Sequence, residues 1–225
     1  MNQSHEFIRF AVETGVLRFG DFKTKAGRIS PYFFNAGLFN DGRSLGRLAG
    51  FYANRMLEAE SADPAARFDM LYGPAYKGIA LAASMAVALA AGGRNLPFAF
   101  NRKEAKDHGE GGVVIGAPLA GRVVIVDDVI SAGTSIGESV TLIESQGAKP
   151  AAVIIALDRM ERGGDAVQVS GTSAVQQVRD RYGLPVHAIA TLEDLLETLD
   201  SMQHSDPAYA AHRSRIADYR RRFGS

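Results

Sequence analysis

Residues 123–135, VVIVDDVISAGTS, decide the fold class of this 225-residue chain. Four consecutive β-branched residues open the stretch, and such a continuous apolar run is typical of a strand buried on both faces of a parallel sheet. Two adjacent carboxylates, Asp127 and Asp128, end the run, and small residues lead into helical periodicity over 134–146. Parallel sheets bind ligands at the carboxyl ends of their strands, so this turn is a candidate binding site.

The chain on either side repeats the alternation of short apolar runs with helical periodicity, which predicts an α/β fold with a central parallel sheet flanked by helices. We expect strands over 68–72, 96–100, 122–127, 151–157 and 186–190, and helices over 4–15, 43–58, 79–91, 134–146, 175–182 and 192–199. Aromatic residues mixed with Gly, Pro and Lys over 16–37 predict a hairpin or small hood outside the sheet. One domain fits best, with a hood over about 1–40, a core over about 41–200 and a basic tail over about 205–225.

Composition excludes several classes of protein. The 25 Lys and Arg residues balance 25 Asp and Glu residues, which argues against a protein that mainly grips nucleic acid or an anionic membrane. The absence of cysteine excludes disulfides, thiolate metal sites and cysteine nucleophiles. The first ten residues lack the apolar region of a signal peptide, and the Ala-rich stretch 78–93 is too short to span a bilayer. We therefore expect a cytoplasmic protein with no nucleic-acid or membrane partner.

The turn after the central strand has the chemistry of a sugar phosphate site. Residues 131–135 bring backbone N–H groups and hydroxyls to a helix N-terminus, which suits a phosphate monoester. Asp127 and Asp128 would repel a bare phosphate, but they suit a polyhydroxyl group or a divalent cation that travels with the ligand. A phosphate loop beside diol-binding acids describes ribose 5-phosphate. The alternative is a strand that simply ends in an acidic turn with a Thr cap.

Two other segments carry cations near glycines. Residues 72–79, YGPAYKGI, form a second strand–turn–helix pattern in which Lys77 would face an anion; alone, this is also the pattern of a plain turn. Residues 101–112, NRKEAKDHGEGG, lack large apolar side chains and end in glycines. They are predicted to be a loop that closes as a lid over a pyrophosphate, the alternative being a solvated loop.

Residues 123–135 resemble the phosphoribosyl pyrophosphate (PRPP) motif of the type I phosphoribosyltransferases. From Phe7 to about Leu199 the chain resembles one family among them, the orotate phosphoribosyltransferases, on three further segments: FKTKAGRISPYFFNAG at 22–37, the lid segment at 101–112, and ALDRMERG at 156–163. The resemblance implies a type I phosphoribosyltransferase fold, Mg²⁺ as cofactor and a homodimer whose lids are shared across the interface. It implies transfer of ribose 5-phosphate from PRPP to N1 of orotate, in the biosynthesis of UMP.

The same resemblance assigns the site residues. PRPP-binding positions are Lys25, Tyr76, Lys77, Arg102, Lys103, Lys106, His108, Asp127, Asp128, Val129, Ile130, Ser131, Ala132, Gly133, Thr134 and Ser135. Orotate-binding positions are Phe33, Phe34, Ser131 and Arg159. Catalytic roles fall to Lys106, His108, Asp127 and Asp128, and Mg²⁺ is expected to be held mainly through PRPP, with the two aspartates nearby.

Several alternatives stay open. Phe33 and Phe34 also suit a hairpin core, and Arg159 a salt bridge at a strand end. The enzyme could use another base, or the fold could serve a PRPP-sensing regulator that binds RNA, which only the arginine-rich stretch 212–225 favours. That stretch otherwise predicts a solvated terminal helix, and the Gly-rich stretch 162–173 receives no role.

Overall fold

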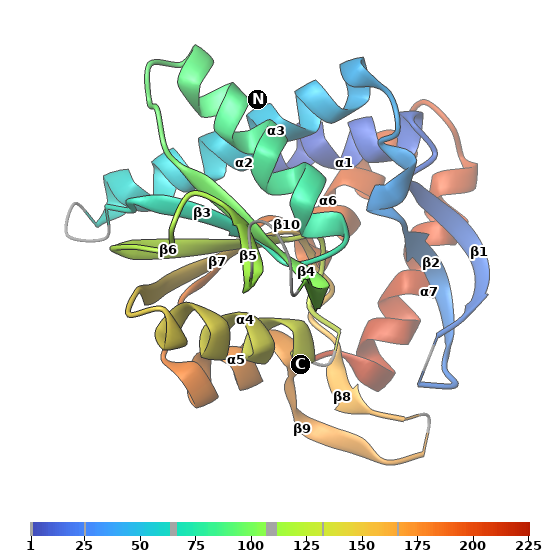
Figure 1. Ribbon diagram of the computed structural model, residues 1–225. Helices are drawn as coiled ribbons and strands as arrows, with labels where there is room; N and C mark the ends of the chain where they lie inside the picture. Colours follow the sequence, from blue (N-terminus) through green and yellow to red (C-terminus); the bar gives the residue numbers. More distant parts are fainter. Residues whose placement is uncertain (1, 25, 64–66, 107–111, 132, 166) are drawn as a thin grey trace.

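The computed structural model describes residues 2–24, 26–63, 67–106, 112–131, 133–165 and 167–225, without the side chains of 103–106. Its centre is a six-stranded sheet of order β10-β7-β6-β3-β4-β5 with helices on both faces (Figure 1). All neighbours pair in parallel except β4 and β5. The strands are β3 (Met70–Gly73), β4 (Phe98–Lys106), β5 (Gly112–Gly116), β6 (Arg122–Asp127), β7 (Lys149–Asp158) and β10 (Val186–Thr191).

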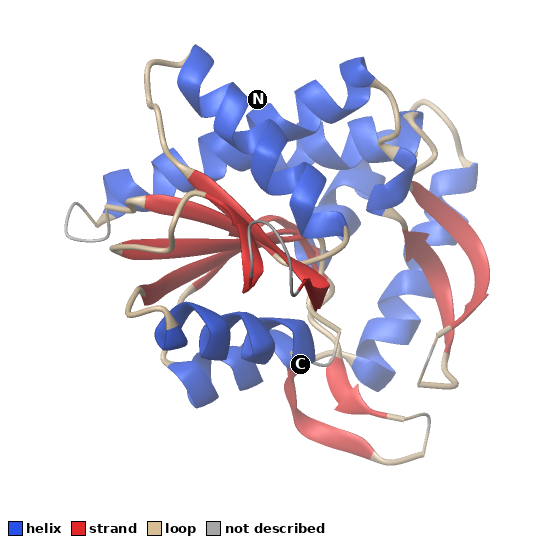
Figure 2. Ribbon diagram, viewed as in Figure 1, coloured by secondary structure: helices blue, strands red, loops and turns tan. Residues whose placement is uncertain are grey.

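The central strands are buried on both faces, as their continuous apolar runs predict. Along β6, Val124 and Val126 belong to one hydrophobic cluster, whereas Val123 and Ile125 belong to another. This alternation follows from the two-residue period of a strand. Helices α1 (Gln3–Glu13), α2 (Gly42–Ala62), α3 (Lys77–Ala91) and α6 (Leu192–Met202) cover the first face, and α4 (Thr134–Ser145) and α5 (Ala174–Tyr182) cover the second (Figure 2). The predicted α/β fold is confirmed.

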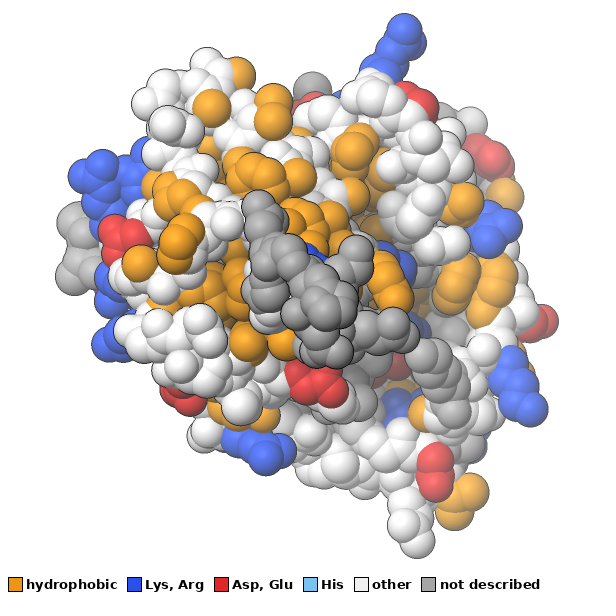
Figure 3. Space-filling model, viewed as in Figure 1, with side chains coloured by type: hydrophobic (Ala, Val, Ile, Leu, Met, Phe, Trp, Pro, Cys, Tyr) orange, Lys and Arg blue, Asp and Glu red, His pale blue; other side chains and the backbone are white. Residues whose placement is uncertain are grey.

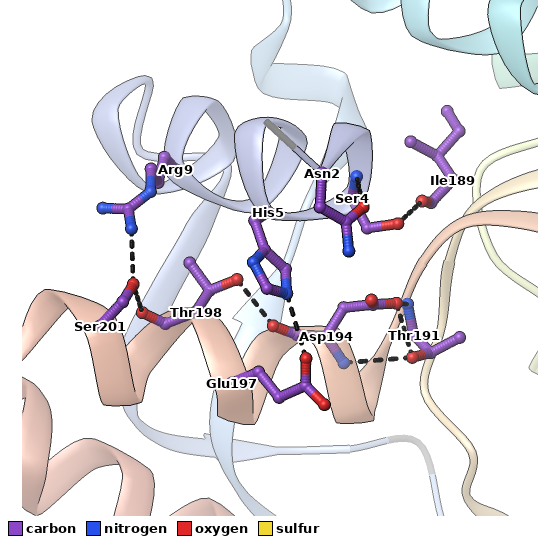
Figure 4. A network of polar contacts seen from close by, with 10 residues as sticks. All are labelled: Asn2, Ser4, His5, Arg9, Ile189, Thr191, Asp194, Glu197, Thr198 and Ser201. Atoms are coloured by element: carbon purple, nitrogen blue, oxygen red, sulfur yellow. Dashed lines mark hydrogen bonds and ion pairs between the residues drawn. The ribbon is translucent and has the colours of Figure 1, made fainter.

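Polar contacts to β10 and α6 hold the N-terminal helix, in addition to its buried apolar face (Figure 4). The Ser4 hydroxyl donates to the carbonyl of Ile189 at 2.8 Å, and the ring of His5 lies 3.2 Å from a carboxylate oxygen of Glu197. Arg9, one helical turn further on, donates to Ser201. The helix therefore has a fixed position on the sheet's first face. No helix in the described part of the chain is long and apolar enough to span a membrane.

The expected hood is an antiparallel hairpin of β1 (Leu17–Lys23) and β2 (Ile29–Phe34), followed by a short 3₁₀ helix, η1 (Ala36–Leu38). A second hairpin, formed by β8 (Arg162–Gly164) and β9 (Val169–Ser173), lies in the Gly-rich stretch for which no role was predicted. Arg28 connects the two hairpins. Its guanidinium is 3% exposed and donates to the carbonyls of Arg162, Gly163, Gly164 and Asp165 at 2.8–3.0 Å.

The C-terminal helix α7 (Ala208–Phe223) corrects the expectation of a solvated tail. One face of it is buried through Ile216, Tyr219 and Phe223, and the helix packs against α6 and β2 (Figure 1). Its arginines are also engaged, since Arg213, Arg215 and Arg220 pair with Asp200, Asp21 and Glu193 respectively. The helix thus belongs to the folded domain and packs on the hood. Because its arginines pair with acidic residues of the same chain, less positive charge remains for a nucleic acid.

The segment 101–112, which was expected to be a lid loop, is a strand over its first half. Residues 101–106 are not a loop but continue β4, which pairs antiparallel with β5 at the edge of the sheet. Sequence reasoning missed β5 altogether. Residues 101–106 extend beyond the part of β4 that pairs with β3, and in the described structure they pair only with β5. Their charged composition therefore resembles that of a loop.

Close packing between strand and turn leaves no room for a side chain at Gly73. An added Cβ atom would lie 1.9 Å from the carbonyl oxygen of Gly78 and 2.9 Å from Cβ of Ala82. We expect Gly73→Ala to lower the free energy of unfolding by about 3 kcal/mol. Gly46→Ala is the matched control, because this helix position is open and the change should stabilise by up to about 1 kcal/mol. Denaturant unfolding of both variants measures this; equal stabilities would contradict the packing argument.

Candidate active site

The order of the strands puts the candidate site at the centre of the sheet. The chain passes from β3 to β4 on one side and later returns to form β6 on the other side of β3. Ligands bind at such a topological switch point, outside the carboxyl ends of the strands. The turn after β3 carries Lys77, and the turn after β6 carries Asp127 and Asp128. The two motifs that the sequence singled out separately are therefore neighbours.

A 2.6 Å ion pair joins the two turns, between Nζ of Lys77 and Oδ2 of Asp128. The Asp128 side chain is 7% exposed, whereas Lys77 is half-exposed at the start of α3. Asn101 lies just after the residues of β4 that pair with β3. It holds the turn after β3, because its Oδ1 accepts from the backbone N–H of Ala75 at 2.8 Å. The peptide bond from Ala75 to Tyr76 is cis, and the Tyr76 side chain is exposed. Sequence reasoning missed Asn101, whose only signal was its place at a strand end.

The acidic turn is held by hydrogen bonds to its neighbours. Asp127 accepts from the backbone N–H of Asp128 at 2.9 Å and from the Ser135 hydroxyl at 3.4 Å. The phenol of Tyr52 donates to the carbonyl of Asp127 at 2.8 Å. Gly133, with a φ of 71°, takes the left-handed conformation just before α4 begins. The backbone and the carboxylate of Asp127 are thus held by neighbours on three sides.

Burial and charge make the acidic turn electrostatically costly. Desolvation raises the pKa of Asp127 to about 7, and the negative charge of Asp128 adds to the rise. A ligand that brings hydroxyl donors or a cation would relieve this cost. Among the described residues no three His, Cys, Asp or Glu side chains form a group that could hold a metal ion. The two carboxylates are oxygen ligands of the kind that a hard divalent cation takes.

Arg159 follows β7, the neighbour of β6, and it forms the strand-end salt bridge that was one of the two alternatives predicted for it. Its Nη2 lies 2.7 Å from Oε1 of Glu161, which is a salt bridge at a strand end, and its guanidinium lies 5.2 Å from the ring centroid of Tyr32 in the hood. The side chain remains 26% exposed. Tyr32, which sequence reasoning passed over in favour of the next two residues, is thus the hood residue that contacts this arginine.

Phe33 and Phe34 point to opposite sides of β2, because successive side chains of a strand alternate. Phe33 is 40% exposed and stacks on Phe22, with ring centroids 5.4 Å apart. Phe34 packs against the first hydrophobic cluster beside Phe7, at a centroid distance of 6.2 Å. Phe33 is the more exposed of the two rings, whereas Phe34 is partly buried and packs against the core.

The remaining predicted residues fall into three groups. Lys25, His108 and Ala132 lie outside the described residues, as do the side chains of Lys103 and Lys106. Val129 and Ile130 pack against the two hydrophobic clusters, and Ser131 and Thr134 are exposed beside the acidic turn. Arg102 is partly buried on β4, and its Nε lacks a hydrogen-bond partner in the described structure.

Comparison with known proteins agrees with this geometry. Residues 48–176 match the phosphoribosyl transferase domain family. The orotate phosphoribosyltransferase of Ralstonia nicotianae is 61% identical over 100% of this chain and 98% of its own length, and that of Cupriavidus necator is 62% identical over 98% and 94%. The crystal structure of orotate phosphoribosyltransferase from Francisella tularensis superposes with a TM-score of 0.82 and 37% identity, covering 98% of this chain and 100% of that one.

The fold and the paired turns define a type I phosphoribosyltransferase. Within that class, the chain belongs to the orotate phosphoribosyltransferase family. The family, the fold and the enzyme function predicted from the sequence, including the place in pyrimidine biosynthesis, are thereby confirmed. The similarity to the Ralstonia relative runs through the C-terminal helix, further than the resemblance at about Leu199 indicated.

The raised pKa of Asp127 has a consequence for stability. Between pH 4 and 7 the folded state holds a proton that the unfolded state has lost, so stability falls as pH rises through this window. We expect Asp127→Asn, without PRPP or Mg²⁺, to raise the free energy of unfolding by about 2–4 kcal/mol at pH 8. The gain should shrink at pH 5. Urea unfolding at both pH values measures this, and a gain independent of pH would contradict the electrostatic cause.

Proposed function

We propose that the two turns at the ends of β3 and β6 bind PRPP, and that N1 of orotate displaces pyrophosphate from its C1 atom to give orotidine 5′-monophosphate. The 2.6 Å pair of Lys77 with Asp128 carries this proposal, because it brings a cation for one end of PRPP against acids for the ribose. The N–H groups and hydroxyls of 131–135, at the start of α4, suit the 5-phosphate at the other end. One elongated ligand with a phosphate at each end fits both turns.

The reaction needs charge stabilisation more than a nucleophile. Glycosyl transfer of this kind passes through an oxocarbenium-like state, and orotate attacks without a covalent enzyme intermediate. In this proposal Lys77 exchanges Asp128 for the leaving pyrophosphate, and Arg102, Lys103 and Lys106 add positive charge from β4. Asp127 and Asp128 hold the ribose hydroxyls. His108 donates a hydrogen bond or a proton to the leaving group.

Mg²⁺ is the proposed cofactor, with Asp127 and Asp128 as the residues nearest to it. Both carboxylates already have partners in Ser135 and Lys77, and the described chain offers no third acidic or histidine ligand beside them. This fits an ion held mainly by the oxygens of PRPP. When bound, such an ion neutralises charge on the pyrophosphate.

Orotate is proposed to lie between the hood and the end of β7. Arg159 offers a guanidinium to the anionic pyrimidine, Phe33 an exposed ring edge and Ser131 a hydroxyl. Lys25 is proposed to reach PRPP from the hood. Phe34 is proposed to line the same site from the other side of β2, while it also packs the hairpin against Phe7 of α1.

The enzyme is proposed to act as a homodimer through the outer face of α3. Val87 and Tyr76 are 71% and 70% exposed, and Val113 of β5 adds a further exposed apolar side chain. Figure 3 shows hydrophobic side chains gathered over α3. A patch of this kind marks an interface. Lys103 and Lys106 belong to β4, which pairs with the strand of Val113, and His108 follows β4 in the sequence. In this proposal the lid closes over the partner's site.

The remaining proposals concern location and partners. The balanced charge and the lack of cysteine suit a cytoplasmic enzyme of small-molecule substrates, without a nucleic-acid or membrane partner. The ion pairs of α7 favour this further, since they tie its arginines to acids of the same chain.

The activity is tested by following the ultraviolet absorbance of orotate with PRPP and Mg²⁺, beside mixtures that lack one component or contain uracil, adenine or hypoxanthine instead. Loss of orotate only in the complete mixture is expected. Transfer to another base, with orotate unchanged, would overturn the proposed substrate.

Arg159→Ala tests the orotate site. We expect the KM for orotate to rise roughly 10- to 100-fold, because a charge-assisted contact is lost, with the KM for PRPP nearly unchanged. Arg43→Ala, at the exposed start of α2, is the control and should leave both constants as they are. Equal increases for both substrates in Arg159→Ala would argue against an orotate contact.

Val87→Glu tests the interface. A charge in the centre of the apolar patch should shift the protein from dimer to monomer and lower activity, as sedimentation and the orotate assay would measure. Val167→Glu is the matched control, because Val167 is 90% exposed on the β8–β9 hairpin, away from α3. A dimer that persists in Val87→Glu would exclude this face.

A further inference from the structure

Arg159 is the end of a side-chain network that begins on the C-terminal helix. Glu161 connects the two ends, since its Oε1 contacts Nη2 of Arg159 at 2.7 Å and its Oε2 accepts from the Tyr219 hydroxyl at 3.3 Å. The Tyr32 hydroxyl donates to the same Oε1 at 3.2 Å and lies 3.4 Å from Nε of Arg159. Three elements that are far apart in the sequence, β2, the end of β7 and α7, thus meet around one guanidinium.

The backbone fixes Glu161 from the same side. Residues Glu161 and Gly224 form an antiparallel β-bridge, and the backbone N–H of Ser225 donates to the carbonyl of Met160 at 2.9 Å. Met160 itself has a φ of 49°, and its N–H is held by the Asp158 carboxylate at 2.8 Å. The chain between Arg159 and Glu161 therefore turns sharply, and the end of α7 holds that turn.

The Tyr219 hydroxyl is suited to donate a hydrogen bond to Glu161 at any physiological pH. Its side chain is buried, and burial, with the nearby Glu161 charge, raises its pKa to about 12. The phenol therefore stays protonated at physiological pH. Its contact with Glu161 leaves that carboxylate less freedom to rotate, and Glu161 in turn restricts Arg159.

We propose that Glu161 and Tyr219 are positioning residues for Arg159, so that the C-terminal helix sets the enzyme's affinity for the anionic pyrimidine. This rests on the proposed role of Arg159 in orotate binding. The guanidinium uses Nε and Nη2 in the network, so Nη1 is the group that can turn to a ligand. An arginine already held in one orientation loses less side-chain entropy when the ligand binds. The network should therefore act on the KM for orotate and not on PRPP.

Tyr219→Phe is the sharpest test, because it removes one hydroxyl and keeps the buried ring. We expect the KM for orotate to rise about 3- to 10-fold, with the KM for PRPP, kcat and the melting temperature nearly unchanged. Tyr209→Phe is the matched control on the same helix, where the ring packs against Phe19, and it should change none of these. In an Arg159→Ala background, Tyr219→Phe should cause no further rise.

Two results would overturn the proposal. One is an unchanged orotate KM in Tyr219→Phe, or equal rises for both substrates with a lower melting temperature, which is the mark of a structural role only. The other is the same rise with and without Arg159. Should Tyr219→Phe fold poorly, Glu161→Gln keeps the volume and removes the charge, and it must raise the orotate KM selectively. Failure of Arg159→Ala itself to affect orotate would instead overturn the proposed orotate site.

Discussion

β3 and β6 lie side by side in parallel although β4 and β5 separate them in the chain, and the active site depends on that pairing. Neither turn alone can hold a ligand with charge at both ends. The sheet brings the end of one strand to the end of the other, and the helices that follow each strand direct their N-termini to the same edge. Gly73 and Gly78 allow the close approach of strand and turn that this needs, since added Cβ atoms there would overlap neighbouring backbone.

The same arrangement concentrates negative charge where the fold would be more stable without it. Asp127 is largely buried beside Asp128, and among the described side chains Lys77 is the cation paired with this turn. Functional sites commonly carry such groups, because a binding surface must offer interactions that the protein alone does not satisfy. Tyr52 and Ser135 fix the backbone and carboxylate of this turn, so the unsatisfied charge is presented in one geometry.

The elements that are specified by their own residues, through an apolar run or a capping glycine, could be predicted from the sequence. The apolar run of β6 gave its bounds, 122–127, and Gly183 marks the end of α5 in the left-handed conformation expected of a C-cap. What could not be predicted depends on distant partners. The β8–β9 hairpin relies on Arg28, and the contact of Tyr32 with Arg159 joins residues separated by 127 positions. Sequence motifs identified Asp127, Asp128 and Lys77. The ion pair of Lys77 with Asp128 and the contact of Asn101 depend on the order of the strands in the sheet, which the motifs do not give.

The hood is built from both ends of the chain, and this has a consequence for synthesis on the ribosome. The β1–β2 hairpin finds its partners in the β8–β9 hairpin and α7, and α1 finds its partner in α6. Domains generally fold as units, and this one cannot be completed before α6 and α7 have been made. The β1–β2 hairpin can pair early from its own two strands, but its contacts with the β8–β9 hairpin and α7 come last. Until then the side of β2 that α7 covers stays open in the nascent chain.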